Sequence, residues 1–154
     1  MIDPYFRTIE GLAVIIQKDW ISFGHQFHLR CGQYDRNHDE KQRSPVFIQY
    51  LDCLRQIMIQ FPQHFEYNYE LLLFLAEEVY ANKYGTFLGN CEYDRKQMKI
   101  VDNTESVWTY VILEKARFTN KYYNPVATRD IIETIPLTAP FCMKEWREHL
   151  FKWS

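Results

Sequence analysis

The sequence predicts a mostly α-helical fold, because its apolar residues recur at helical spacing and no segment alternates as a strand does. The clearest apolar stripes lie at 9–20, 47–61 and 69–83. The run from Leu71 to Ala76 is apolar on nearly every side of a helix, which predicts a central, buried helix. With 47% hydrophobic and 25% charged residues the composition is typical of a globular protein, and the length of 154 residues corresponds to one domain or a piece of one.

The first helix is expected to begin near Asp3-Pro4 or at Thr8, since both offer an oxygen that caps a first turn. Gly24 marks its end. The residues on its apolar face are Ile9, Leu12, Ile16 and Trp20. The following segment, Phe23 to Arg43, is polar and lacks helical periodicity, so we expect a loop there.

Two further helices are predicted in the middle of the chain. One begins at Ser44-Pro45 and ends before Pro62, and its apolar stripe is Phe47, Leu51, Leu54, Met58 and Phe61. The other runs from about Tyr69 to Lys83, with Gly85 beyond its end. Its inward residues are Leu71, Leu72, Leu75 and Val79.

The last third of the chain is expected to be less regular. Glu92 to Asn103 is polar and predicts a linker, and Ser106 caps a helix that runs to about Glu114. Three prolines then break the chain into short extended pieces: Pro125, Pro136 and Pro140. A final amphipathic segment from Met143 to Trp153 carries Trp146, Leu150 and Trp153.

Charge and cysteine content exclude several classes of function. The net charge is −2, so no overall field attracts nucleic acid, and we predict no nucleic-acid partner. The longest apolar run is far shorter than the ~18 residues that cross a bilayer. The four cysteines form no CxxC pair, which favours reduced thiols in a cytoplasmic protein; they are Cys31, Cys53, Cys91 and Cys142.

One group in the expected loop has the residue types of a zinc site: His25, His28, Cys31 and His38. A closed metal site also needs rigid spacing and partners for the imidazoles, and a polar loop supplies neither. Solvated side chains are therefore the favoured interpretation. We predict no metal and no cofactor.

No catalytic residue is predicted in these 154 residues. A cysteine-based phosphatase needs an arginine six positions after its nucleophile, so that the intervening N–H groups and the guanidinium surround the phosphoryl oxygens. Six positions after the four cysteines stand Asn37, Ile59, Gln97 and Glu148. None of them is an arginine.

Several segments closely resemble the myotubularin-related phosphatases, and they occur in the same order as in that family. They are Pro4–Gly32, which resembles the stretch after the family's catalytic loop, then Arg43–Pro62, Tyr84–Glu92, Ser106–Val111 and the tryptophan-containing end at Trp146–Trp153. The likeness covers nearly the whole chain. The first four of these segments, in the same order and spacing as in the family, are far more specific than one motif.

The resemblance implies that residues 1–154 are the helical C-terminal portion of an α/β cysteine-phosphatase domain. The family's nucleophile lies in a C-S-D-G-W-D-R-T loop that is absent from this chain, as are the upstream sheet, the PH-GRAM region and the coiled coil. The resemblance further implies a cytoplasmic protein, peripheral on endosomal membranes, that acts on phosphatidylinositol 3-phosphate and 3,5-bisphosphate. It also makes an oligomer with itself or with other family members an expected partner.

The resemblance assigns two substrate-binding positions, which lie just after the FGH sequence. Active family members have two arginines four residues apart there, near the inositol phosphates. Arg30 matches the second, whereas the first position is Gln26. A neutral amide donates hydrogen bonds to phosphate but forfeits a charge-assisted bond. The alternative for Arg30 is a salt bridge in a surface loop.

Three interpretations of the function remain open from the sequence. The chain is part of an active phosphoinositide 3-phosphatase that is not active as this chain alone, or part of an inactive relative that binds an active partner. The third interpretation is a free-standing helical interaction module.

Overall fold

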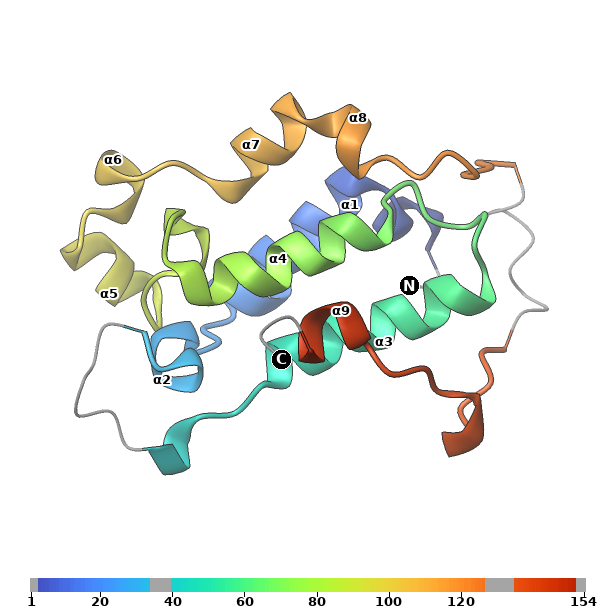
Figure 1. Cartoon of the computed structure of the whole chain (residues 1–154). Coiled ribbons are helices and arrows are strands. Elements are labelled where there is room, and N and C mark those ends of the chain that lie inside the picture. The colour runs from blue at the N-terminus through green and yellow to red at the C-terminus, as the bar shows by residue number, and fades with distance from the viewer. Residues whose placement is uncertain (1–2, 34–39, 127–134, 152–154) are drawn as a thin grey trace.

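The computed structural model describes residues 3–33, 40–126 and 135–151. Helices and connecting segments make up these ranges (Figure 1), and their only β-type pairing is an isolated antiparallel bridge between Tyr67 and Thr119. The prediction of a mostly helical fold is therefore confirmed. Within the same ranges, no helix combines the length and the apolar character needed to cross a membrane.

The N-terminal helix uses both of the predicted starting points. A short 3-10 helix, Pro4–Arg7, is capped by Asp3, whose carboxylate accepts from the Tyr5 N–H at 2.8 Å. Helix α1, Ile9–Ile15, then begins at Thr8, whose hydroxyl accepts from the Gly11 N–H at 2.9 Å. Asp3 and Thr8 therefore each begin a helix, where the sequence suggested two alternative starts of a single helix.

The end of this helix differs from the prediction, because Ile16–Ser22 is a π-helix rather than a continuation of α1. In its wider turns an N–H donates to the carbonyl five residues earlier, as in the 2.8 Å bond from the His25 N–H to the Trp20 carbonyl. Ile16 and Ile21, five residues apart, are both buried as a result, while Trp20 is only half-buried against the core. An α-helical pattern does not reveal Ile21 as a core residue.

Helices α3, Val46–Gln60, and α4, Tyr69–Ala81, form the centre of the molecule. Pro45 occupies the position before α3 and no side chain caps that helix, so the cap expected from Ser44 is not formed. At the start of α4 the Asn68 side chain accepts from the Leu71 N–H at 3.2 Å. The predicted inward residues of α4 are all fully buried: Leu71, Leu72, Leu75 and Val79.

The segment expected to be a linker is helical, which corrects the prediction for Glu92 to Asn103. Helix α5 spans Glu92–Gln97 and α6 spans Ile100–Asn103, separated by Lys99 in the left-handed conformation. Acidic residues in the first turn of α5 and basic residues in its last turn match the helix dipole. Because α5 buries no side chain, hydrophobic periodicity cannot reveal it.

The remaining elements are short. Ser106 caps α7, Val107–Leu113, as predicted, through a 3.3 Å bond from the Trp108 N–H. The others are α2, Phe27–Cys31; α8, Lys115–Phe118; α9, Arg147–Leu150; and the 3-10 turns η3, Glu40–Gln42, η4, Gly85–Phe87, and η6, Pro140–Cys142.

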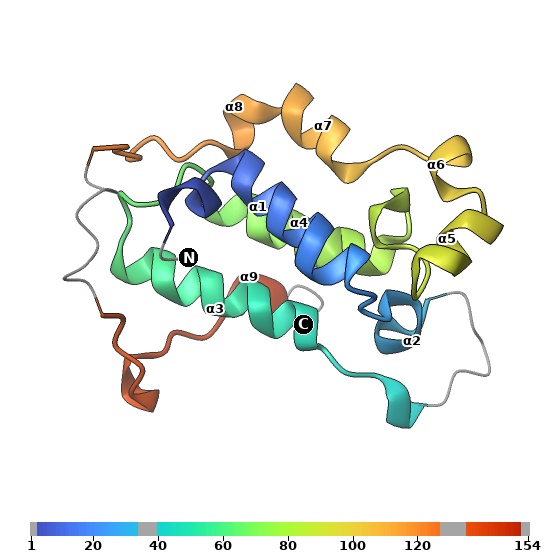
Figure 2. The ribbon, with the colours of Figure 1, turned by 180° about the vertical axis from the view of Figure 1, so that it is seen from behind.

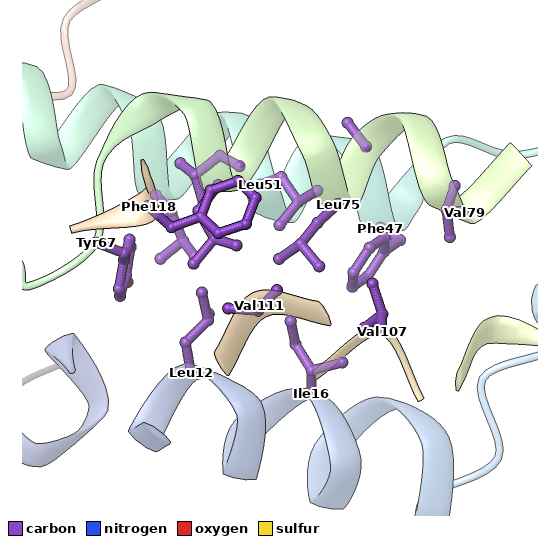
Figure 3. Close-up of a cluster of buried hydrophobic side chains, with 14 of the residues drawn as sticks. Leu12, Ile16, Phe47, Leu51, Tyr67, Leu75, Val79, Val107, Val111 and Phe118 are labelled. Carbon is purple, nitrogen blue, oxygen red and sulfur yellow. The ribbon is translucent and has the colours of Figure 1, made fainter. Parts of the chain in front are cut away.

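The hydrophobic core lies between α1, α3, α4 and α7. Helix α4 contacts α2, α3, α8 and α9, while α7 and α8 lie along one side of α1 and α4 in both views (Figures 1 and 2). Figure 3 shows Leu12 and Ile16 pointing from the N-terminal helix toward the side chains of the central pair. The core residues labelled there also include Phe47, Leu51, Tyr67, Leu75, Val79, Val107, Val111 and Phe118.

The C-terminal segment is held on α3 by polar contacts as well as by its tryptophan. In the segment predicted to be amphipathic, Met143 to Trp153, Trp146 is buried whereas Leu150 is exposed, and α9 has four residues. Trp153 lies outside the described residues. The Gln56 amide accepts from the Lys144 N–H at 3.0 Å and donates to the Lys144 carbonyl at 2.7 Å.

Candidate functional site

The two predicted substrate-binding residues lie on α2, a helix within the segment where a loop was expected. Gln26 occupies the position before the helix and Arg30 lies in its last turn. Gly24, with φ 94°, and Gly32, with φ 66°, bracket the helix in a backbone conformation that favours glycine. The buried Phe27 anchors α2 on the core.

Gln26 and Arg30 line the same surface hollow, of about 410 Å³. The π-helix forms one wall and the start of α2 forms the other. The Arg30 N–H donates to the Gln26 carbonyl at 2.8 Å, so the two side chains are one helical turn apart. The residues that line the hollow are Asp19, Trp20, Phe23, Gly24, His25, Gln26 and Arg30.

The Arg30 guanidinium donates to the Gln42 carbonyl at 3.1 Å. The Arg30 carbonyl accepts from the Ser44 N–H at 3.1 Å, which ties the end of α2 to the segment before α3. Among the side chains that the structure describes, which do not include that of Glu40, no carboxylate lies within ion-pair distance of this guanidinium. Most of its five N–H donors make no hydrogen bond to a described residue.

The Gln26 side chain is exposed and does not cap α2, although it stands where a capping residue would. It makes no hydrogen bond to another described side chain or carbonyl. Its amide is therefore available to a ligand in the hollow, beside the Arg30 guanidinium.

His25 is one of the aromatic residues that line the hollow. Its ring packs edge-on against Trp20, with centroids 4.9 Å apart, and against Phe27, at 4.7 Å. Burial lowers the pKa of His25, and the positive charge of Arg30 lowers it further. The imidazole is thus held neutral at physiological pH. Sequence reasoning weighed His25 only as a metal ligand.

Two side chains outside α2 hold it in place, one distant in the sequence and one just after the helix. The Asn90 side chain accepts from the Leu29 N–H at 3.0 Å, and the buried Gln33 amide donates to the carbonyls of Val79, at 2.7 Å, and Phe87, at 3.3 Å. Asn90 lies in the family-like segment Tyr84–Glu92, but the sequence does not predict either contact, because each depends on how α4 and η4 pack against α2.

The cysteines and histidines of this region show no arrangement for catalysis or metal binding within the described residues. Burial raises the pKa of the Cys31 thiol to about 11, which makes it a poor nucleophile. No group of three metal-ligating side chains occurs in the described part of the chain, and His38 lies outside it.

Comparison with known proteins shows which family the sequence belongs to. The sequence model of the myotubularin-like phosphatase domain matches residues 1–96. The chain is 38% identical to myotubularin of Xenopus tropicalis over 154 residues, which are 100% of this chain and 25% of that protein.

Two further relatives have names that state an activity. The chain is 40% identical over 146 residues to phosphatidylinositol-3,5-bisphosphate 3-phosphatase MTMR8 of Homo sapiens, covering 95% of this chain and 20% of the relative. It is 41% identical over 148 residues to phosphatidylinositol-3,5-bisphosphate 3-phosphatase MTMR6 of Rattus norvegicus, covering 96% and 22%. The chain thus spans a quarter or less of the length of these relatives. It belongs to the myotubularin-like phosphatase family.

Proposed function

We propose that these 154 residues are the helical C-terminal part of a phosphoinositide 3-phosphatase domain, and that the hollow beside α2 binds the phosphorylated inositol headgroup. The observation that carries the proposal is the juxtaposition of Arg30 and Gln26 in one hollow, with no described carboxylate paired to the arginine. Two relatives named as phosphatidylinositol-3,5-bisphosphate 3-phosphatases supply the substrate class.

Each side chain of the hollow has a distinct role in this proposal. Arg30 grips a phosphate through parallel N–H bonds, a geometry that lysine copies poorly. Gln26 donates an uncharged hydrogen bond beside it. Asp19 also lines the hollow and repels anions, so the phosphate sits on the Arg30 side, with neutral His25 behind it.

The chemical step belongs to a loop outside these residues. The family's nucleophilic cysteine and its arginine, six positions later, are supplied by a catalytic loop on the α/β part of the domain. The present chain therefore binds and orients the headgroup, and it does not cleave the phosphate ester.

The substrate class also indicates where in the cell the protein acts. We infer a cytoplasmic protein that is peripheral on endosomal membranes, as a single chain or in an oligomer with other family members, because the named substrate of the relatives is a membrane lipid. A fluorescent fusion of the full-length protein should leave endosomes when 3-phosphoinositide synthesis is blocked. An unchanged distribution contradicts this inference.

Headgroup binding is tested by calorimetric titration with inositol 1,3,5-trisphosphate, the soluble headgroup of the bisphosphate lipid. A charged hydrogen bond contributes ~1.5–3 kcal/mol, so Arg30→Ala should weaken binding by about ten- to a hundredfold. Arg147→Ala is the matched control, because that exposed arginine lies on α9, where it makes a surface ion pair with Glu145. Equal affinities of Arg30→Ala and the native chain, with equal melting temperatures, overturn the proposal.

The same variant tests the reaction in a chimera. Here the chain replaces the matching quarter of Xenopus tropicalis myotubularin, which supplies a catalytic loop. Arg30→Ala should lower kcat/KM by about ten- to a hundredfold, since each 1.36 kcal/mol is a factor of ten. Arg147→Ala should leave kcat/KM unchanged.

A further inference from the structure

We propose that Asn90 is a positioning residue for the headgroup site, which caps α2 from 61 positions away so that Gln26 keeps its amide free for the ligand. This inference rests on the proposed function, because it takes Arg30 and Gln26 to be the residues that bind the headgroup. It assigns a role to a residue far from them in the sequence.

The first observation is how the N-terminus of α2 is satisfied. The first N–H groups of any helix lack partners within the helix, and the residue before the helix usually supplies a side-chain oxygen. Gln26 stands there and makes no such bond. The Leu29 N–H is instead satisfied by the Asn90 side-chain oxygen at 3.0 Å.

The second observation is that Asn90 is itself held firmly. Its backbone N–H donates to the Asp94 carboxylate at 3.3 Å. The Arg95 guanidinium donates to three carbonyls just before it, those of Gly85, Thr86 and Leu88, at 3.0, 3.2 and 2.7 Å. The residues that lead to Asn90 are therefore buried and bonded, and its side chain is presented to α2 from a fixed support.

The third observation is that the other end of α2 is held by the same neighbours. Gln33, just after the helix, donates to Phe87 of η4 and to Val79 of α4. With Asn90 bonded to the first turn and Gln33 anchored beyond the last, the direction of α2 relative to the core is fixed at both ends. Arg30 lies between the two anchors, so its guanidinium is aimed by them.

These contacts give the capping of α2 and the binding of the ligand to two different residues. If the residue before α2 capped the helix, its polar group would be used within the protein. Because Asn90 performs the capping, the position of Gln26 is free to vary in charge without loss of the helix. Residue 26 thus sets the affinity of the site for different headgroups, and residue 90 keeps α2 in position.

The experiment compares Asn90→Ala, Asn90→Asp and the native chain in the titration with inositol 1,3,5-trisphosphate. Asn90→Ala should bind about three- to tenfold more weakly, the factor that corresponds to loss of one capping hydrogen bond. Asn90→Asp keeps the acceptor oxygen and should restore most of the affinity. Asn103→Ala is the matched control, since Asn103 is an exposed asparagine at the end of α6.

A second readout reports the cap directly. Amide hydrogen exchange at Leu29 should accelerate in Asn90→Ala and slow again in Asn90→Asp, while the amides of α4 exchange as in the native chain. If Asn90→Ala does not fold, Asn90→Ser takes its place, because the serine oxygen is one bond too short to reach Leu29.

The possible results separate this inference from the proposed function. If Arg30→Ala weakens binding and Asn90→Ala does not, the positioning role is wrong and the headgroup site stands. If Asn90→Ala and Asn90→Asp lose affinity and melting temperature equally, Asn90 has only a general structural role and the inference is overturned. If Arg30→Ala has no effect, the proposed function itself fails.

Discussion

Gln26 gives the hollow a neutral amide next to a charged guanidinium, and this choice affects how many phosphates are bound tightly. Gln26→Arg should increase affinity for inositol 1,3,5-trisphosphate about three- to tenfold more than for inositol 1,3-bisphosphate, because a second charge-assisted bond favours the additional phosphate. Paired calorimetric titrations measure the difference. Gln97→Arg adds the same charge at the exposed end of α5 and is the control. An equal gain for both headgroups contradicts the prediction.

The titration of His25 reports on the same site. Its pKa is lowered by burial and by Arg30, so NMR titration should place it below the ordinary 6.5. Removing the positive charge in Arg30→Ala should raise it, and so should bound headgroup phosphate, which offsets that charge. A His25 pKa unaffected by Arg30→Ala contradicts the placement of the guanidinium beside the imidazole.

The lowered pKa has a consequence for stability with a definite sign. Between the folded pKa and 6.5 the unfolded chain binds a proton that the folded chain does not, so the free energy of unfolding rises with pH across this window. The contribution is fully present above pH 6.5 and decreases as the pH falls. The melting temperature should drop less between pH 7 and pH 5 in His25→Phe than in the native chain. His64, whose pKa is also lowered by burial, retains part of the acid sensitivity.

Helix α4 is the element on which the other helices pack, and Leu75 lies at its centre with no exposed surface. Leu75→Ala should lower the free energy of unfolding by ~2–5 kcal/mol, the usual cost of a large cavity. Leu113→Ala on α7, where the leucine is 77% exposed, should change it by less than ~0.5 kcal/mol. Urea unfolding followed by circular dichroism measures both, and a Leu75→Ala loss as small as that of the control contradicts the assignment.

Helices α3 and α4 were predictable from the sequence, as were the starts of α1 and α7 at their caps, whereas α2 and α5 were not. In α3 and α4 an apolar stripe repeats over several turns, which is a signal that periodicity detects. Helix α2 has five residues and α5 has six, too few to be stable alone. Helix α2 is held by the side chain of Asn90, and α5 is held by the bonds that its own Arg95 donates to the carbonyls of the η4 segment. Such contacts exist only after folding.

At the scale of the whole molecule, the sequence located the candidate site but not its shape. Resemblance to a family pointed to Gln26 and Arg30 without placing them in space. The hollow lies between the π-helix, which contributes Asp19 and Trp20, and the start of α2, with His25 on the segment that joins them. Helical periodicity assumes α-helix throughout, so it predicted neither the π-helix nor the aromatic lining of the hollow.

The proposed function assigns headgroup binding to these residues and the chemical step to a catalytic loop outside them, which yields a prediction for the 154 residues alone. No cysteine is followed by an arginine at six positions, and the Cys31 thiol has a pKa of about 11. Without a thiolate and the N–H cradle of the catalytic loop, no covalent phosphoryl intermediate forms. The chain should therefore release no phosphate from a soluble phosphatidylinositol 3-phosphate analogue above the rate of a heat-denatured sample, in a colorimetric phosphate assay. The chimera with the catalytic loop of Xenopus tropicalis myotubularin is the positive control. If the chain alone releases phosphate and this release disappears in Cys31→Ser or Cys142→Ser, a cysteine within these residues acts as a nucleophile. That result contradicts the separation of headgroup binding from catalysis.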